Sequence, residues 1–382
     1  MAKEKKIIKH QEIYNSICNN ILNGQYQPGE LIPTEIELAK KFKASRPTVG
    51  RAMRDLEQKG LIFRKQGRGT FVREATHSRG QTLGILMHWQ DVQTDTNLSI
   101  FGAMVPEMSR VASRMGYSLM LNDSHSTEIE EVVKRAQNIC QQLIELQVAG
   151  VFFTPLELGH DDLAVNQELA DTFDRAGVAV TLLDRDLDDT HIRSKYDIVG
   201  VDNEHSAYVL TNHLWDRGCR KIDFLVGDKV SSALTDRLCG YRQFLADQQV
   251  EFEPQRVHHF DAKKYFTEPV GFIPQEIIDF VEKVKSDDVD AVMCGNDATA
   301  ARLIQFMTRN GIQVPKEVKI TGFDDLPINA YLPVPLTTVC QRPQFLAYEA
   351  VRTLLNRIEE PDFPARDIMV TTKLIIRASS GI

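Results

Sequence analysis

From residue 82 onward, short apolar runs alternate with amphipathic helical segments. The runs are nearly continuous in Val, Ile, Leu and Phe, which is typical of strands covered on both faces. Strands separated by helices indicate βαβ units and parallel sheets. The expected strands are 82–87, 117–121, 150–153, 178–183, 198–201, 221–226, 291–293, 319–321 and 337–340, and the helical candidates include 128–146, 204–217, 298–310 and 343–358.

The length of this pattern constrains the architecture. At about 300 residues it exceeds one typical doubly wound sheet, so we expect two such sheets, crossed by several chain connections, with a cleft between them. Before it lies a helix-rich segment that ends in two short β runs, followed by a polar stretch without apolar periodicity. The predicted domains are therefore 1–74 and 82–382, joined by a linker at 75–81.

Charge is divided unevenly between these parts. The chain holds 45 Lys and Arg against 53 Asp and Glu, a net charge of −8. Residues 1–75 carry 15 basic and 8 acidic residues, hence +7, which leaves 30 basic and 45 acidic residues, hence −15, for the remainder. A basic head on an acidic body indicates a polyanionic partner for the head. The alternative is a solvated surface whose charge is merely uneven.

Three helices are expected in the head. The first covers 11–23, the second opens at 33–35, and the third begins at Ser45. Ser45 should cap the third helix by accepting from the Thr48 N–H, because the intervening Pro47 has none. Two helices joined by a short turn, with a positive N-terminus on the second, indicate a helix-turn-helix.

Basic side chains stand at the ends of these elements. A helix N-terminus offers free N–H groups to a phosphate, and Arg46 there has the donor fork that suits guanine O6 and N7. Residues 61–73 form an expected hairpin with glycines where positive φ is needed. Its tip carries Arg68, which suits a narrow minor groove. These features predict a head that binds DNA.

The head contains I-L-N-G-Q-Y-Q-P-G-E-L-I-P-T-E-I-E-L-A at 21–39, S-R-P-T-V at 45–49, A-M-R-D-L-E-Q-K-G-L-I at 52–62 and G-R-G-T-F-V at 67–72. These motifs closely resemble the GntR winged-helix domain, which implies operator binding. The predicted DNA-binding residues are Thr34, Glu35, Ser45, Arg46, Thr48, Arg51, Arg54, Lys65, Gln66, Gly67, Arg68, Gly69 and Thr70.

The head departs from the family pattern at two positions. Family members often carry Arg where Ile36 stands and again where Gly50 stands. Arg51 and Arg54 are the candidates to compensate for the lost phosphate contact.

The body contains Q-T-L-G-I-L at 81–86, V-G-V-D-N at 199–203, H-L-W-D-R-G-C-R-K-I at 213–222, D-R-L-C-G-Y at 236–241, C-G-N-D-A-T-A at 294–300, V-K-I-T-G-F-D-D at 318–325 and P-L-T-T-V-C-Q at 335–341. These motifs resemble the LacI/GalR regulator core, itself similar to periplasmic sugar-binding proteins. The predicted fold class is therefore α/β, with an N-terminal winged helix-turn-helix and a two-lobed, periplasmic-binding-protein-like core of parallel sheets. A GntR head on such a body resembles bacterial arabinose repressors, which implies a monosaccharide effector.

Candidate effector residues follow the strands, where ligands bind in open α/β sheets. Paired donors and acceptors suit sugar hydroxyls, and an aromatic ring suits the apolar sugar face. Arg237 and Asp297 match the ligand-binding arginine and aspartate of the family. Structural roles remain open for several of them. Asn296 or Asp297 could cap the next helix, and Arg237 could be a solvated helix residue. Trp89 could fill a domain edge, and Asp184 with Arg185 could belong to a solvated, charged turn. The predicted set is His88, Trp89, Thr154, Asp184, Arg185, Arg237 and Asp297, whereas 322–325 reads as structural and 257–273 matches no motif.

Cysteine spacing, the absence of long apolar runs and the absence of common catalytic motifs exclude several classes of protein. Six scattered cysteines lack C-x-x-C or Cys/His spacing, so we expect no zinc site and no disulfide framework. The first ten residues do not read as a signal peptide, and no apolar run is long enough to cross a bilayer. G-x-S-x-G, Walker A and H-E-x-x-H motifs do not occur. We therefore expect a cytoplasmic, nucleoid-associated bacterial protein that is not an enzyme, with no cofactor, no metal and no membrane partner.

The resulting prediction is a homodimeric transcriptional regulator of carbohydrate metabolism, most simply a repressor, that binds an inverted repeat of double-stranded operator DNA. A small sugar-like effector would bind between the two lobes and weaken DNA binding, with the opposite direction, activation or corepression, as the alternative within this class. One rival is a solute-binding protein for sugar transport, which a cleaved N-terminus would favour. Another is a sugar-modifying enzyme with a regulatory head, which turnover of a bound sugar would reveal.

Overall fold

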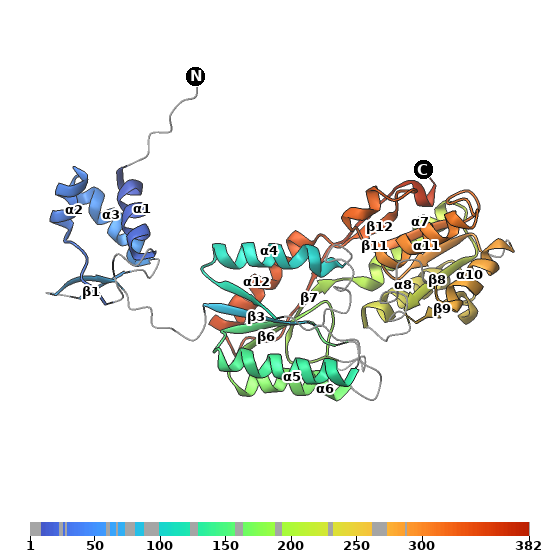
Figure 1. Cartoon of the computed structure of the whole chain (residues 1–382), viewed down its shortest axis with the longest axis horizontal. Coiled ribbons are helices and arrows are strands. Elements are labelled where there is room, and N and C mark those ends of the chain that lie inside the picture. Colours follow the sequence, from blue (N-terminus) through green and yellow to red (C-terminus); the bar gives the residue numbers. More distant parts are fainter. Residues whose placement is uncertain are drawn as a thin grey trace, which may run out of the picture. The chain divides into compact units, whose positions relative to one another are not determined.

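The computed structural model describes residues 9–22, 26, 29–58, 62–65, 68–72, 81–87, 99–122, 129–156, 163–187, 193–227, 232–261, 273–286 and 289–381. The chain divides into two compact units, Met1–Ser78 and Arg79–Ile382, which Figure 1 draws with their elements labelled. In the part of the chain that is described, no helix is long and apolar enough to span a membrane.

Unit 1 is a three-helix domain with a β-hairpin. Its elements are α1 (Lys9–Leu22), α2 (Glu35–Phe42), α3 (Arg46–Gln58), β1 (Ile62–Lys65) and β2 (Gly69–Val72). One core holds Ile13 and Ile17 of α1, Leu38 of α2, and Val49 and Met53 of α3. The three expected helices and the hairpin are thus confirmed, and each helix is held by its apolar face.

The hairpin is extended by a segment from before α2. β1 and β2 pair antiparallel from Ile62↔Val72 to Lys65↔Gly69, and Leu31 forms a bridge to Phe71. Gly69 needs to be glycine, because its φ is 110° and an added Cβ would lie 2.6 Å from Cδ1 of Leu31. The second strand of the hairpin is therefore held against the segment that leads into α2.

Unit 2 contains two six-stranded sheets. The N-terminal lobe is built on a parallel sheet of order β13-β7-β6-β5-β3-β4. Helices α4 and α12 cover one face of it and α5 and α6 cover the other (Figure 1). The elements of this lobe are β3 (Thr82–Leu86), α4 (Ile100–Arg114), β4 (Ser118–Leu121), α5 (Ile129–Glu145), β5 (Gly150–Phe153), α6 (Leu163–Arg175), β6 (Ala179–Leu183), β7 (Asp197–Val201), α12 (Pro343–Glu359) and β13 (Asp367–Val370).

The C-terminal lobe repeats this plan with the sheet order β14-β12-β11-β10-β8-β9, in which only β14 runs antiparallel to its neighbour. Helices α7 and α8 cover one face, and α10 and α11 cover the other. The elements are α7 (Asn203–Asp216), β8 (Ile222–Gly227), α8 (Ser232–Asp247), β9 (Val257–Phe260), α10 (Gln275–Lys285), β10 (Ala291–Cys294), α11 (Asp297–Arg309), β11 (Lys319–Asp324), β12 (Thr337–Cys340) and β14 (Lys373–Ile375).

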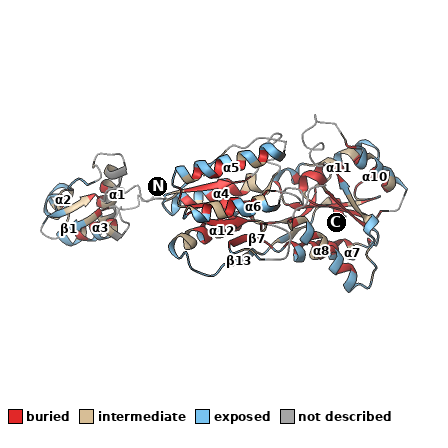
Figure 2. Cartoon of the chain, turned by 90° about the horizontal axis from the view of Figure 1, so that it is seen from below, coloured by how far each residue is buried: buried red, intermediate tan, exposed pale blue. Residues whose placement is uncertain are grey.

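The chain crosses between the lobes at 201–203, 340–343 and 370–373. Buried residues concentrate in the strands and the inward faces of the helices (Figure 2), and one hydrophobic cluster continues from the N-terminal lobe into the C-terminal lobe. The predicted pair of largely parallel sheets with several crossings is confirmed. Because parallel strands share a direction, their carboxyl ends form one edge in each lobe, and polar residues there can gather into a site.

Candidate DNA-binding and effector sites

The start of α2 is fixed by a reciprocal cap. The Thr34 N–H donates to Oε2 of Glu37 at 2.7 Å, and the Glu37 N–H donates to Oγ1 of Thr34 at 3.3 Å. The Thr34 N–H, whose hydrogen bond favours the ionised carboxylate, lowers the pKa of Glu37. Thr34 was predicted to lie at DNA, and the structure shows its side chain engaged in this cap.

The N-terminus of α3 is closed by the expected serine cap. The Thr48 N–H donates to Oγ of Ser45 at 3.4 Å, and the two hydroxyl oxygens lie 2.7 Å apart. Arg46 is exposed beside them at the first helical position. The cap is thus confirmed, and Arg46 stands next to a helix N-terminus of the kind that binds phosphate. The DNA contacts of Ser45, Arg46 and Thr48 stay predictions.

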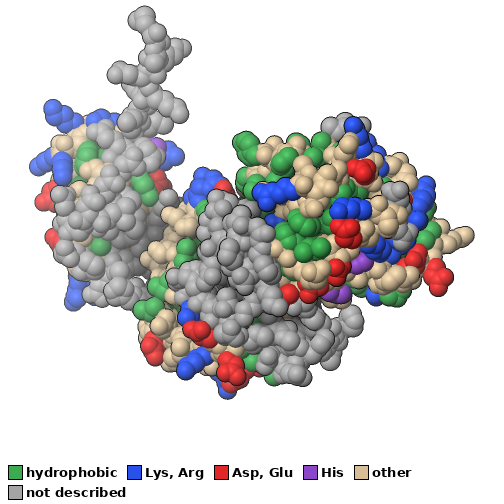
Figure 3. All heavy atoms as spheres, turned by 45° about the vertical axis from the view of Figure 1, so that its right-hand side comes forward, with side chains coloured by type: hydrophobic (Ala, Val, Ile, Leu, Met, Phe, Trp, Pro, Cys, Tyr) green, Lys and Arg blue, Asp and Glu red, His purple; other side chains and the backbone are tan. Residues whose placement is uncertain are grey.

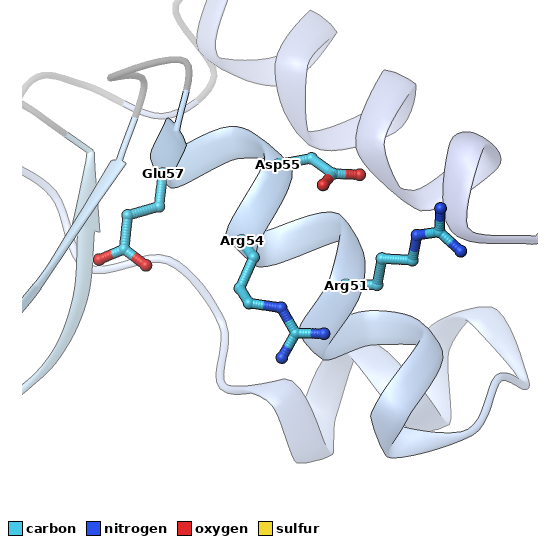
Figure 4. A pocket seen from close by; sticks show the side chains of 4 residues that line it. All are labelled: Arg51, Arg54, Asp55 and Glu57. Atoms are coloured by element: carbon cyan, nitrogen blue, oxygen red, sulfur yellow. The ribbon is translucent and has the colours of Figure 1, made fainter.

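Two further arginines project from α3 into the solvent. Arg51 and Arg54 are exposed, and with Asp55 and Glu57 they line a shallow hollow on the surface of unit 1 (Figure 4). Glu57 points toward the hairpin, away from Arg51 (Figure 4). Blue Lys and Arg side chains are spread over the face of unit 1 that Figure 3 shows. The basic side of α3 therefore offers cations to a polyanion.

Another arginine of unit 1, Arg64, is engaged in ion pairs with residues of the same domain. Arg64 of β1 forms ion pairs with Glu35 at 3.1 Å and with Glu57 at 3.2 Å. Glu35 also lies against α3, since a Cβ added at Gly50 would be 3.6 Å from its Oε2. The predicted DNA-binding residue Glu35 thus stands in an intramolecular pair. The absence of Arg at position 50 keeps a second cation away from this carboxylate.

The hairpin tip is described in part. Lys65, Arg68 and Gly69 are exposed, and Thr70 is partly buried. Gln66 and Gly67, also predicted at DNA, lie outside the described residues. The exposed basic side chains of the hairpin and of α3 thus form the described part of the predicted DNA interface.

In the N-terminal lobe, three of the predicted effector residues follow neighbouring strands. Thr154 comes after β5, and its buried Oγ1 has no hydrogen-bond partner among the described residues. Asp184 comes after β6 with φ of 70°. Arg185 donates from Nε to the carbonyl of Pro155 at 3.1 Å, and its Nη1 lies 3.8 Å from Oδ2 of Asp184. The adjacent order of β5 and β6 brings these groups together.

In the C-terminal lobe, Arg237 of α8 is buried at the strand ends. It donates from Nε to Oδ1 of Asn203 at 2.9 Å and from Nη1 to the carbonyl of Gly295 at 2.6 Å. Burial lowers the pKa of Arg237, and the charges of Asp324, Asp184 and Asp297 oppose that shift. Because Asp184 belongs to the other lobe, candidate residues of both lobes lie within electrostatic reach of one another.

Asp297 is placed deeper than Arg237. It has no exposed surface, and it accepts hydrogen bonds from the Leu326 N–H at 2.8 Å, Asn329 Nδ2 at 2.6 Å and Thr338 Oγ1 at 2.6 Å. Asn296 caps α11 by accepting from the Thr299 N–H, so the capping role falls to Asn296. Burial raises the pKa of Asp297. Its effector role stays a prediction.

His88 and Trp89 lie outside the described residues. Sequence reasoning did not select Asp324, which ends β11 and acts electrostatically on Arg237 and Asp297. Its position at a strand end was the available signal. The sequence predicts a structural role for 322–325, Asp324 included, and at Gly322 the structure supplies a reason, since an added Cβ would lie 2.2 Å from Oδ1 of Asp297.

Comparison with known proteins finds matches to both parts of the chain. Residues 9–72 match the model for bacterial regulatory proteins of the gntR family, and residues 211–380 match that for a periplasmic binding protein-like domain. An arabinose metabolism transcriptional repressor of Geobacillus stearothermophilus is 26% identical over 383 residues, covering 99% of both chains. A ribose operon repressor of Haemophilus influenzae is 23% identical, covering 99% of this chain and 98% of its own.

Among solved structures, a transcriptional regulator CelR–cellobiose complex covers 91% of this chain and 100% of its own, with 21% identity and a TM-score of 0.64. That likeness shows the fold. The chain thus joins a GntR-type helix-turn-helix domain to a periplasmic-binding-protein-like core, as the motifs indicated, and relatives that match it over nearly its whole length are transcriptional repressors.

Proposed function

We propose that this chain, a GntR-type helix-turn-helix domain fused to a periplasmic-binding-protein-like core, is a sugar-responsive transcriptional repressor of carbohydrate metabolism. The observation that carries the proposal is the buried Arg237, which lies at the strand ends of one lobe within electrostatic reach of Asp184 on the other. A cation held there, with part of its donor set still available, suits a polyhydroxyl ligand that touches both lobes. The full-length likeness to an arabinose repressor supports the same ligand class.

The head is the proposed DNA-binding part. The N-terminus of α3, with Ser45, Arg46 and Thr48, faces the DNA, and Arg51, Arg54, Lys65 and Arg68 supply cations for phosphates and the minor groove. Gln66, Gly67, Gly69 and Thr70 complete the wing. Thr34 and Glu35 act by holding α2 and Arg64 in place.

The effector lies between the lobes and touches Thr154, Asp184, Arg185, Arg237 and Asp297. His88 and Trp89 complete this set as the residues after the first strand of the N-terminal lobe. Effector binding changes the angle between the lobes and weakens operator binding by about 1–3 kcal/mol, a typical coupling between two sites. The two domains cover 1–74 and 82–382. The linker at 75–81 is the connection through which the effector site communicates with the DNA-binding site.

The working form is a cytoplasmic homodimer on an inverted-repeat operator, because the two-fold symmetry of a dimer matches two half-sites. Exposed apolar side chains such as Tyr331, Phe345 and Tyr348 give unit 2 surface for a second copy. The protein carries out no turnover of its effector.

The test is a thermal-shift screen of the purified protein against arabinose, ribose, cellobiose and their phosphorylated forms. A ligand at a hundred times its dissociation constant stabilises the native state by about 2.7 kcal/mol, which is a readily visible shift. The sugar that stabilises the protein should also lower its affinity for a DNA duplex selected by the protein from a random pool. No stabilisation by any sugar would contradict the effector assignment, and conversion of the bound sugar would contradict the absence of catalysis.

A further inference from the structure

The connections between the lobes of unit 2 contain very few residues outside helices and strands. Asp202 alone separates β7 from α7, Gln341 and Arg342 separate β12 from α12, and Thr371 and Thr372 separate β13 from β14. Hinge motions are absorbed by a few residues at the ends of regular elements. A change in the angle between the lobes is therefore absorbed by these three short connections.

The third connection is held between the other two. Val370 at the end of β13 pairs with Val201, the last residue of β7. Lys373 at the start of β14 pairs with Cys340, the last residue of β12. The two residues 371–372 thus span the gap between the two sheets, and a rotation of one lobe against the other has to turn them.

Thr372 ties this connection to the first turn of α7. Its Oγ1 lies 2.9 Å from Oγ of Ser206, a residue that is 2% exposed. The Ser206 hydroxyl donates its own hydrogen to the carbonyl of Asp202. The hydrogen between the two side chains is therefore that of Thr372, and Ser206 accepts it. A chain of two hydrogen bonds thus runs from the third connection to the first.

The same turn of α7 positions a candidate effector residue. Asn203, the first residue of α7, accepts from Nε of Arg237 at 2.9 Å. The charge of Asp184, on the other lobe, acts on Arg237. The Thr372–Ser206 bond thus holds the turn that positions Arg237, at an angle of the lobes that brings candidate residues of both lobes close together.

One such bond is large enough to matter for regulation. A hydrogen bond between neutral groups that exists in one arrangement and not in another changes the ratio of the two by about two- to tenfold. Typical couplings between an effector site and a second site change an affinity by about 5–150-fold. The bond is therefore a sizeable part of the control that a moving pair of lobes provides.

We infer that the Thr372–Ser206 hydroxyl pair is a positioning contact that stabilises the effector-binding angle of the lobes and breaks when they rotate to the DNA-binding arrangement. The inference rests on the proposed function and deepens it, because it assigns regulation of the site to two residues that do not touch the effector. Loss of the bond lowers sugar affinity, and it raises the operator affinity of the sugar-saturated protein by a similar factor, because both depend on the same equilibrium.

The test uses the full-length protein in two titrations. The first measures binding of whichever of arabinose, ribose and cellobiose stabilises the wild type most. The second measures the affinity for the selected duplex without that sugar and at saturation. The variants are Thr372→Val, Thr372→Ser, Ser206→Ala and the combination of Thr372→Val with Ser206→Ala. Thr371→Val is the matched control, because Thr371 is the exposed neighbour in the same connection.

Thr372→Val removes the hydroxyl and should weaken sugar binding by about two- to tenfold. The ratio of operator affinities without and with sugar should fall by a similar factor, which a merely structural role would leave unchanged. Thr372→Ser keeps the hydroxyl and should behave as the wild type. Ser206→Ala should weaken sugar binding too, and the losses should not add in the double variant, because each change removes the same bond. Thr371→Val should match the wild type in both titrations.

Thr372→Val with wild-type values in both titrations would overturn the inference, while a sugar-responsive wild type upheld the proposed function. Tighter sugar binding by Thr372→Val would place the bond in the DNA-binding arrangement and contradict the assignment. Additive losses in the double variant, or an equal loss in Thr372→Ser, would show that the hydroxyl pair is not the cause. If Ser206→Ala does not fold, Thr372→Val against Thr372→Ser decides. A wild type that binds none of the three sugars would overturn the proposed function and this inference with it.

Discussion

The guanidinium carbon of Arg237 lies 3.6 Å from the centre of the Phe323 ring, so that the cation rests on the face of an aromatic side chain. This contact and the hydrogen bonds to Asn203 and Gly295 fix the group in one orientation. A lysine keeps the charge but lacks the planar fork that makes these contacts together.

Arg237→Lys should therefore lower sugar affinity at least tenfold and leave operator affinity without sugar unchanged. The lost hydrogen bonds should also cost about 1.5–3 kcal/mol of stability. Calorimetric titration and chemical unfolding measure the two effects. Arg242→Lys is the matched control, because Arg242 lies on the same helix and also rests on a ring, that of Phe252. Similar losses in both variants would mean that the helix, not the site, is affected.

Arg46→Ala should weaken operator binding by about 1–3 kcal/mol, as expected for one base-reading arginine, with no change in sugar affinity. Arg64→Ala serves as the control, because Arg64 is already paired with Glu35 and Glu57 inside the head. Fluorescence anisotropy with the selected duplex measures both. A larger loss in Arg64→Ala than in Arg46→Ala would contradict the proposed interface.

Gly240→Ala should destabilise unit 2 by about 3 kcal/mol, the upper part of the usual range for overpacking. The added Cβ would lie 1.9 Å from the carbonyl oxygen of Glu204, so α7 and α8 would have to separate. Gln243→Ala, an exposed change on the same helix, should alter stability little. Urea unfolding compares the two, and a Gly240→Ala protein as stable as the control would show that the helices are free to move apart.

His213 should make the protein less stable in mild acid. Its ring is buried, lies 2.9 Å from Oγ of Ser380, and has a pKa lowered first by burial and then by Arg217. The folded state therefore disfavours the proton, so the stability from neutral His213 is present above the unfolded value of about 6.5 and is lost as pH falls below it.

Melting temperatures between pH 8 and pH 5.5 check this. His213→Gln keeps a hydrogen-bonding side chain without the titration, and its melting temperature should depend less on pH than that of the wild type. His205→Gln removes an exposed histidine of the same helix and should follow the wild-type profile. Parallel profiles for all three proteins would contradict the prediction.

Much of the fold could be predicted because its signals are local. The central strands are continuous apolar runs. In the head, capping residues and the periodic spacing of apolar residues mark the helices. The edge strands β9, β13 and β14 were not predicted. They are short and partly exposed, as in the burial pattern of Asp367–Val370, and their apolar runs are at most three residues long, so their pairing partners define them.

The candidate site shows the same contrast between features that are local in sequence and features that depend on distant segments. Sequence determined that the chain has a basic helix-turn-helix head and a two-sheet body, and that polar residues follow the strands, because periodicity and motif spacing are properties of neighbouring residues. Tertiary structure decided which of those residues have their hydrogen bonds satisfied inside the protein. Asp297 follows one strand and Asp324 ends another strand of the same sheet, yet three donors from elsewhere in the chain surround the first and one reaches the second. Burial and hydrogen-bond partners depend on segments far apart in sequence, which only the folded chain brings together.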